Sequence, residues 1–248
     1  MFRHLLRTTP RPLILACALS LGAAFFATRF PDVPGASAGS YVSTFLIALP
    51  SAVALFRYLG WRRATLSLLA LSAFGYAIET VGVAIGFPYG SFYYGEALGP
   101  KLADLVPYLL PVSYAPLVVG AVAASWGSHV RSLHALTAAL LLVLIDGVLD
   151  PGAVTLGFWI WPGGGPYYGV PPSNFAGWLL SGLLAAAILL ATGRWRSTPL
   201  PGLLDSVIIA LSFWTSVAVL SGMILPILLG ITLSVYLLGR RSRLRAAK

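Results

Sequence analysis

"SLHALTAALLLVLIDGVLDP", residues 132–151, is the stretch that decides the fold. Its length is close to the roughly 20 residues that a helix needs to cross a hydrocarbon core about 30 Å thick. Two aspartates, Asp146 and Asp150, close the apolar run, and Pro151 disfavours helical geometry at the residue before it. The stretch therefore predicts a membrane-spanning helix over 132–149 that ends at Asp150.

Similar apolar runs lie on both sides of this span. Of the 248 residues, 58% are hydrophobic and only 9% are charged, with a mean hydropathy of +0.87, whereas soluble domains carry about 25% charged residues. The sequence predicts an all-α integral membrane protein, a single polytopic domain over 1–248 with about eight (7–8) transmembrane helices. The expected spans are 12–28, 41–59, 64–86, 104–125, 132–149, 175–192, 203–219 and 222–239.

The last two spans form one continuous apolar stretch, which we divide at Ser221-Gly222 because small residues permit a tight turn there. At the other end, residues 1–28 are also typical of a signal peptide, with a basic start and an apolar centre. We favour a retained first helix, since the later spans need no cleavable leader.

The placement of the basic residues predicts the topology. With the N-terminus in the cytoplasm, fourteen Lys and Arg residues fall on the inner side, and only Arg29 and Lys101 fall on the outer side. Cytoplasmic loops carry such an excess, so we expect both termini in the cytoplasm of a multi-pass protein of the cell membrane. The net charge of +9 is then explained by topology and by anionic membrane lipids, and no nucleic-acid partner is expected.

The acidic residues give the first functional signal, because the chain holds only seven. Glu79 lies inside the third span, and Asp146 and Asp150, spaced i, i+4, share one face of the fifth. Intramembrane acids are costly and usually mark function, and no Arg is expected at the same depth to pair with them. We predict Glu79, Asp146 and Asp150 as catalytic candidates, Asp104 as a helix N-cap, and Asp205 as an ion-pair partner of an Arg.

The chemistry of a buried carboxyl group suggests what these acids do. A low dielectric favours the neutral form, and a second carboxyl nearby favours it further. Such a group can act as a general acid toward a weak base.

Aromatic residues are concentrated in two outer loops, "FPYGSFYYGEALGPKLA" (87–103) and "DPGAVTLGFWIWPGGGPYYGVPPSN" (150–174). An interfacial aromatic belt does not require the accompanying Gly and Pro, which indicate constrained backbone that re-enters the outer leaflet where protein shields it. Aromatic faces attract cations, so acids beside them suit a reaction that passes through a carbocation. The predicted substrate-binding residues are Tyr89, Tyr93, Tyr94, Trp159, Trp161, Tyr167, Tyr168, Asn174, Phe175 and Trp178.

Motifs that the chain lacks narrow the possibilities. No HExxH motif occurs, and the three histidines fall at the inner side, so no metal site is expected. "PGGGP" lacks the Lys-Ser/Thr of a phosphate-binding loop. The aspartate pair could hold a magnesium diphosphate, as in membrane prenyltransferases, but the outer side is nearly devoid of the Arg and Lys that such sites need.

Three stretches taken together resemble the CruF-type carotenoid hydratases, the family of carotenoid 1,2-hydratases and bisanhydrobacterioruberin hydratases. They are Glu79, "GFPYGSFYYGEALGPKLADLVPYLLPVSYAP" (86–116) and "DGVLDPGAVTLGFWIWPGGGPYYGVPPSNFAGW" (146–178), within a motif region over 75–180. The chain departs from the expected pattern at Tyr114, where much of the family has Trp.

The resemblance implies an enzyme of carotenoid biosynthesis, a cofactor-independent hydro-lyase. Such an enzyme adds water to the terminal 1,2 double bond of an acyclic (ψ) end group of a carotenoid and yields a tertiary 1-hydroxy carotenoid. It also implies an acyclic or monocyclic carotenoid as substrate and other carotenoid-pathway enzymes as partners.

The residues themselves suggest roles in such a reaction. A protonated Asp146 or Glu79 gives a proton to C2, and Asn174 orients the water that adds at C1. A carboxylate, Tyr167 or Tyr168 accepts the proton that the water loses. The alternatives are a carotenoid cyclase that uses the same protonation step, a non-catalytic carotenoid-binding protein, and a proton-coupled transporter.

Overall fold

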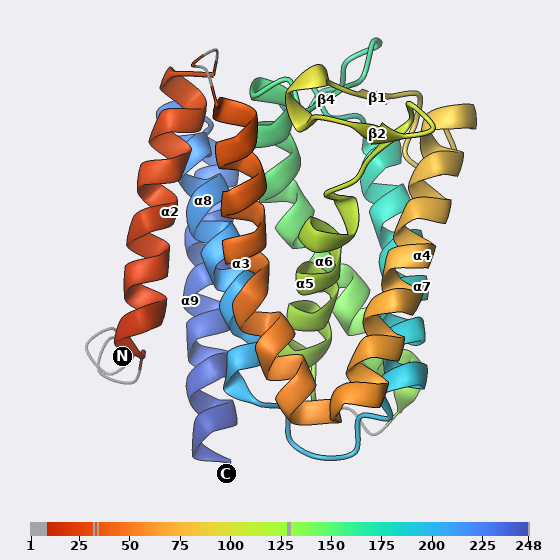
Figure 1. Ribbon diagram of the computed structural model, residues 1–248, viewed down its shortest axis with the longest axis vertical. Helices are drawn as coiled ribbons and strands as arrows, with labels where there is room; N and C mark the ends of the chain where they lie inside the picture. The colour runs from red at the N-terminus through yellow and green to blue at the C-terminus, as the bar shows by residue number, and fades with distance from the viewer. Residues whose placement is uncertain (1–8, 32, 34, 128–129, 248) are drawn as a thin grey trace.

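The computed structural model describes residues 9–31, 33, 35–127 and 130–247. Within these residues, eight helices run alternately up and down in one bundle (Figure 1). The first helix begins and the last helix ends at the same end of the bundle, the lower end in Figure 1. The helices are α2 (Arg11–Arg29), α3 (Ala36–Leu59), α4 (Trp61–Ile85), α5 (Leu110–Ala124), α6 (Arg131–Thr155), α7 (Pro172–Gly193), α8 (Asp205–Leu220) and α9 (Ile224–Ala246), and the 3-10 turn η2 (Pro201–Leu204) precedes α8.

Seven of the described helices are long and apolar enough to cross a membrane, and α5, with 15 residues, is shorter. The predicted class, an all-α multi-pass membrane protein, is thus confirmed. The division of the last apolar stretch is also confirmed, because α8 ends at Leu220 and α9 begins at Ile224. Gly222 makes the turn between them with φ +70, a left-handed conformation that glycine adopts without steric cost.

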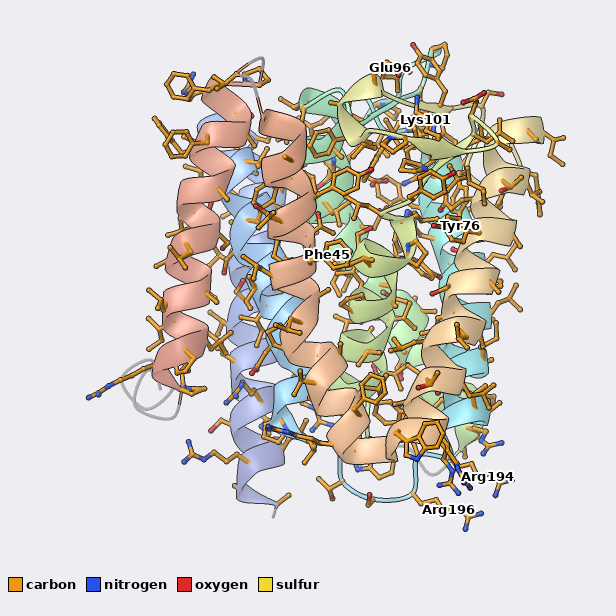
Figure 2. All side chains as sticks on the ribbon, in the orientation of Figure 1. Phe45, Tyr76, Glu96, Lys101, Arg194 and Arg196 are labelled. Carbon is orange, nitrogen blue, oxygen red and sulfur yellow. The ribbon has the colours of Figure 1, made fainter. Side chains whose placement is uncertain are left out.

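The two ends of the bundle differ in charge. Arg194 and Arg196 lie at the lower end in Figure 2, whereas Glu96 and Lys101 lie at the upper end. The turns between α3 and α4 and between α7 and α8, together with the end of α9, bring most of the described Arg residues to the lower end. Arg3, Arg7, Lys248, His4 and His129, also assigned to that side, lie outside the described residues. The end that faces the cytoplasm stays a prediction.

The two aromatic loops meet at the upper end and form one cap (Figure 1). Strand β1 (Tyr93–Tyr94) of the first loop pairs antiparallel with β4 (Trp159–Ile160) of the second. The first loop continues through the turn η1 (Glu96–Leu98) and the hairpin of β2 (Lys101–Leu102) and β3 (Val106–Pro107). Residues far apart along the chain, such as Tyr93 and its partner Ile160, are thereby held side by side.

The predicted span 104–125 is wrong in its first third. Residues 104–107 belong to the β2–β3 hairpin, and residues 108–109 form a turn before the helix. The turn of the hairpin places Ala103 and Asp104 at positive φ, a conformation that Asp tolerates better than most residues. Asp104 is therefore an exposed turn residue and not a helix N-cap. The helix begins only at Leu110, with Pro111 in its first turn, where the missing amide costs nothing. As a result α5 starts well below the cap (Figure 1).

The predicted end of the fifth span at Asp150 is also wrong, because α6 continues through Pro151 to Thr155. A proline inside a helix leaves the carbonyl four residues earlier without its amide donor, which here is the carbonyl of Gly147. The Tyr167 hydroxyl donates a hydrogen bond to that carbonyl at 2.9 Å. The cap thus supplies the donor that the helix lacks, and a local preference is overridden by a residue 20 positions away.

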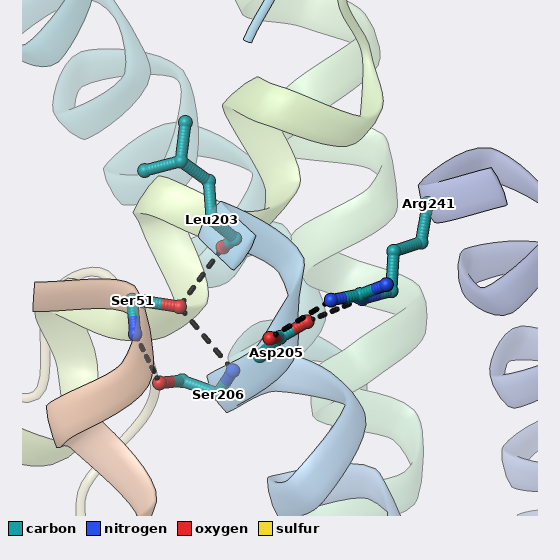
Figure 3. Close-up of polar contacts among 5 residues, drawn as sticks. All are labelled: Ser51, Leu203, Asp205, Ser206 and Arg241. Carbon is teal, nitrogen blue, oxygen red and sulfur yellow. Dashed lines mark hydrogen bonds and ion pairs between the residues drawn. The ribbon is translucent and has the colours of Figure 1, made fainter. Parts of the chain in front are cut away.

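A polar network ties four elements together in the lower half of the bundle (Figure 3). Arg241 on α9 forms an ion pair with Asp205 at the start of α8, Nε to Oδ1 at 2.6 Å, so the predicted Asp–Arg pairing is confirmed. Ser51 on α3 donates from its hydroxyl to the Leu203 carbonyl at 2.9 Å, and its amide donates to the Ser206 hydroxyl at 3.0 Å. These contacts fix α3, α8 and α9 around α5, which is buried from Tyr114 to Ala124.

Candidate functional site

Three acids project into the interior of the bundle just below the cap. Glu79 comes from α4, and Asp146 and Asp150 come from α6, with exposed fractions of 8%, 1% and 1%. Glu79 lies close enough to Asp150 for the charges of the two groups to interact. Among the described residues, none of these acids forms an ion pair with Lys, Arg or His. Burial this deep without a cation is costly, so the acids need other partners.

Asn174 is the partner of both aspartates. It lies in the first turn of α7 and is 2% exposed. Its side-chain amide donates to Asp146 Oδ2 at 3.0 Å and also to Asp150 Oδ2. The i, i+4 spacing on α6 puts the two carboxyl groups on one face, and one amide nitrogen then bridges them. The result is a carboxyl pair held in a single geometry by a neutral donor.

Glu79 is held by the cap. The Tyr94 hydroxyl donates to Glu79 Oε2 at 2.8 Å, and the β1–β4 pairing positions Tyr94 opposite Trp159. Burial raises the pKa of the Tyr94 hydroxyl, and the nearby charge of Glu79 raises it further. Tyr94 therefore remains a hydrogen-bond donor throughout the physiological pH range.

The Tyr89 ring packs between α4 and α7, against Gly82 and Gly177. A Cβ on Gly82 would approach its ring to 2.8 Å, and a Cβ on Gly177 would overlap the same ring, so only glycine fits at either position. The Tyr89 carbonyl accepts hydrogen bonds from Trp161 Nε1 and from the Ser173 hydroxyl, both at 3.2 Å. Burial, followed by the charge of Glu79, raises the pKa of the Tyr89 hydroxyl. The ring is thus fixed next to the acids in its neutral form.

A cavity of about 790 Å³ starts at these acids and runs away from them under the cap. Near the acids its wall is aromatic, and beyond them it passes α5 and α8 and reaches α2 and α3. The residues at the far end include Phe26, Phe30 and Tyr41. An elongated, mainly apolar hollow with carboxyl groups at one end fits a long hydrocarbon that reacts at its tip.

The predicted site residues divide into two groups. Eight of them line the cavity: Glu79, Asp150, Tyr89, Tyr94, Trp159, Trp161, Asn174 and Trp178. Asp146 lies behind them and joins the group through Asn174.

The other four predicted residues, Tyr93, Tyr167, Tyr168 and Phe175, also lie outside the cavity wall. Tyr93 is 48% exposed and Tyr168 is 38% exposed, on the outer surface of the cap. Tyr167 donates to the Gly147 carbonyl, and its ring packs against Phe175 with the centroids 5.6 Å apart. Among these four, Tyr167 therefore has an evident structural role, which is to support the helix that carries the aspartates.

Several residues that line the cavity were not among the predicted site residues, namely Phe92, Tyr114, Phe158, Phe213 and Trp214. The signal for Phe213 and Trp214 was available, since "SFWTS" (212–216) places polar and aromatic residues within an otherwise aliphatic span. Tyr114 stood out only as a departure from a family pattern. Its ring lies 5.9 Å from that of Trp178, so it faces the site from α5.

The fold and the site together define a class of protein. It is a multi-pass helical membrane protein that holds an acid cluster beside a large, mainly apolar cavity. In the described residues, no group of three or more His, Cys, Asp or Glu side chains is arranged to hold a metal ion.

Comparison with known proteins gives the family. Residues 39–237 match the family described as "Carotenoid biosynthesis protein", and the chain belongs to that family. A bisanhydrobacterioruberin hydratase from Haloarcula japonica is 41% identical over 181 residues, which cover 69% of this chain and 61% of that relative. The chain thus matches about three-fifths of the length of this curated relative. No solved structure matches the chain.

Proposed function

We propose that the protein adds water to the terminal 1,2 double bond of an acyclic (ψ) end group of a carotenoid. The observation that carries this proposal is the Asp146–Asn174–Asp150 bridge at one end of a long apolar cavity. A carboxyl pair in a dry, aromatic environment is suited to protonating an alkene. The name of the Haloarcula japonica relative, a hydratase, supports the same reaction class.

The shape of the cavity supports a carotenoid as the substrate. Tyr89, Trp161 and Trp178 form its wall near the acids, and residues of α2 and α3 line its far end. In the proposed complex the ψ end lies at the acids and the polyene extends under the cap toward α2. Because the acids stand at one end only, a single end group reacts in each binding event.

The reaction begins with proton transfer. The aspartate pair shares one proton and delivers it to C2 of the end group, and the alkene electrons form the new C–H bond. The cation then forms at C1, the more substituted carbon. Aromatic faces such as that of Trp159 stabilise positive charge by cation–π attraction, worth about 2 kcal/mol where solvent is excluded.

The reaction ends with the addition of water. The water oxygen bonds to C1, and one of its protons passes to a carboxylate, which restores the charge of the site. Hydration changes no oxidation state, so the proposed reaction needs no redox cofactor.

A direct test uses a bacterium that accumulates lycopene. Expression of the wild-type protein should yield a pigment heavier by one water, detected by liquid chromatography and mass spectrometry. Asp146→Asn and Glu79→Gln should reduce that product by at least about 100-fold, the lower range for loss of a general acid–base group.

Matched controls are Asp104→Asn and Glu96→Gln, since both acids are exposed on the cap and do not line the cavity. Both controls should hydrate lycopene like the wild type. If the wild type forms no hydrated pigment from lycopene or from a monocyclic ψ carotenoid, the proposed function is wrong. If Asp146→Asn and Glu79→Gln both hydrate normally, the assignment of the acids is wrong.

We further propose that the cap faces away from the cytoplasm in the cell membrane, with both termini cytoplasmic. The Arg residues at the lower end would then contact anionic lipid head groups. In a Cys17→Ser background, Gly163→Cys should react with a membrane-impermeant maleimide on intact cells, whereas Arg196→Cys should react only after lysis. The reverse pattern would invert the topology. We also propose that other carotenoid-pathway enzymes supply the substrate.

A further inference from the structure

Three buried polar atoms around the acids lack a hydrogen-bond partner among the described protein atoms. They are the Tyr114 hydroxyl, the Ser181 hydroxyl and Asp146 Oδ1. Tyr114 is 5% exposed and Ser181 is fully buried. A buried polar group that lacks a hydrogen bond destabilises the folded protein, so this grouping is unfavourable unless a small polar ligand supplies the missing hydrogen bonds.

The hydroxyls of Ser181 and Tyr114 lie on the helix faces of α7 and α5 that also carry site residues. Asn174, Trp178 and Ser181 follow the spacing i, i+4, i+7 on α7, so all three lie along one face of that helix. Tyr114 comes from α5 on the other side and lines the cavity. The hydroxyl of Ser181 is therefore presented in the same direction as the amide of Asn174.

The hydroxyls also lie near Glu79. Ser181 stands beside the hydroxyls of Tyr89 and Tyr114, yet neither Ser181 nor Tyr114 completes a hydrogen bond of ordinary geometry there. Glu79 interacts electrostatically with both tyrosines. Three hydroxyls and one carboxyl group thus surround a small polar corner next to an otherwise apolar cavity.

We propose that this corner binds the water molecule that adds to the cation, with Tyr114 and Ser181 as its hydrogen-bonding partners. A buried water molecule typically makes two to four hydrogen bonds to otherwise unsatisfied groups, which Tyr114, Ser181 and Glu79 can supply. This inference rests on the proposed hydration and deepens it, because it assigns the second substrate to a defined place.

This assignment gives the acids different roles, with the aspartate pair as the proton donor and Glu79 as the proton acceptor. The aspartate pair donates the proton to C2. The bound water then gives an electron pair to C1, a C–O bond forms, one O–H bond of the water breaks, and its proton passes to the carboxylate of Glu79. Tyr94, which donates to Glu79 Oε2, holds that carboxylate in place during the transfer. The water-binding corner is also what separates a hydratase from a cyclase, since both begin with the same protonation.

The test separates protonation from water capture. Membranes that contain the protein are incubated in D2O buffer with lycopene in liposomes, and deuterium is measured in recovered lycopene and in the hydrated product. A cation that forms but is not captured loses a proton and returns as an alkene that carries deuterium. Tyr114→Phe and Ser181→Ala should each lower hydration at least about tenfold, whereas deuterium incorporation into lycopene persists or rises. Asp146→Asn and Asp150→Asn should lose both signals.

The matched control is Ser221→Ala. Ser221 also carries a buried hydroxyl without a partner, but it lies in the turn between α8 and α9 and does not line the cavity. This variant should keep both signals, and retention of bound pigment by each variant monitors its fold.

Two results would overturn the assignment of the water site while leaving the hydratase activity established. One is normal hydration by both Tyr114→Phe and Ser181→Ala. The other is a parallel loss of hydration and deuterium exchange in variants that still retain pigment. A wild-type protein that produces no hydrated carotenoid overturns the proposed function itself and is recognised before any variant is compared.

Discussion

The hydrogen bond from Tyr167 to α6 predicts a conditional loss of stability. The Tyr167 hydroxyl donates to the Gly147 carbonyl at 2.9 Å, and that carbonyl lacks a helical donor because residue 151 is proline. Tyr167→Phe removes the donor and little else. Pro151→Ala, in contrast, introduces a backbone amide four residues after Gly147, which can donate to the same carbonyl. The effect of Tyr167→Phe should therefore depend on residue 151.

The magnitude follows from the environment of this bond. Gly147 is buried, and Tyr167 is half-buried, so water replaces the lost donor only in part. An unsatisfied buried carbonyl costs about 1–3 kcal/mol, whereas hydrogen bonds between membrane helices average about 0.6 kcal/mol. We therefore expect a loss of about 1 kcal/mol in the wild-type background. For a chain of this size that corresponds to a fall in Tm of about 2–4 °C.

The assay is thermal unfolding of the purified protein in detergent, followed by tryptophan fluorescence. Wild type, Tyr167→Phe, Pro151→Ala and the double variant form a double-mutant cycle. The fall in Tm caused by Tyr167→Phe should be about 2–4 °C with Pro151 present and less than about 1 °C with Ala at that position. Tyr168→Phe is the control, since its hydroxyl accepts only a long contact of 3.4 Å from the Leu225 amide.

Equal falls in Tm in the two backgrounds would refute the reasoning, because the tyrosine would then stabilise the protein through packing and not through the orphaned carbonyl. The absence of any fall with Pro151 present would refute it as well, since the Gly147 carbonyl would have found another partner.

Two other predictions concern packing and charge. Gly177→Ala should displace the Tyr89 ring, which its Cβ would overlap; overpacking costs about 1–3 kcal/mol, so pigment retention and Tm should both fall. The control is Gly163→Ala in the cap, which has open space at its Cβ and does not line the cavity, and which should leave both unchanged. Arg241→Met should leave Asp205 buried without its cation and cost about 3–5 kcal/mol, measured as loss of monodisperse protein on size-exclusion chromatography. Asp205→Leu combined with Arg241→Met should recover folded protein, and a double variant as poor as the single one contradicts this account.

The sequence predicts the spans correctly where hydropathy alone decides the outcome. Seven of the eight expected spans correspond to long helices, because a run of about twenty apolar residues has few alternatives in a bilayer. The predicted start of the fourth span and the predicted helix end before Pro151 were wrong. In both places hydropathy alone does not decide the structure. The start of α5 depends on the pairing of β2 with β3, and the continuation of α6 depends on Tyr167 in the second aromatic loop.

The candidate site shows the same division. The i, i+4 spacing on α6 was sufficient to predict that Asp146 and Asp150 act together. It did not reveal that a single amide from Asn174 bridges them, nor that Tyr94 holds Glu79. The roles of these residues in catalysis remain predictions. Tyr114 stood out only as a departure from a family pattern, and Ser181 gave no signal, because a single Ser within an apolar helix is common.

The sequence by itself determined the membrane-spanning class, the order of the helices and the concentration of acids and aromatics toward one end. These properties follow from the lengths of the apolar runs and from the positions of the charged and aromatic residues between them, and both can be read locally along the chain. Only the tertiary structure decided which aromatic loops pair, where α5 begins and which polar atoms surround Glu79 and Asp146. Such contacts join residues that are distant along the chain, and their partners are selected by packing, which no local pattern records.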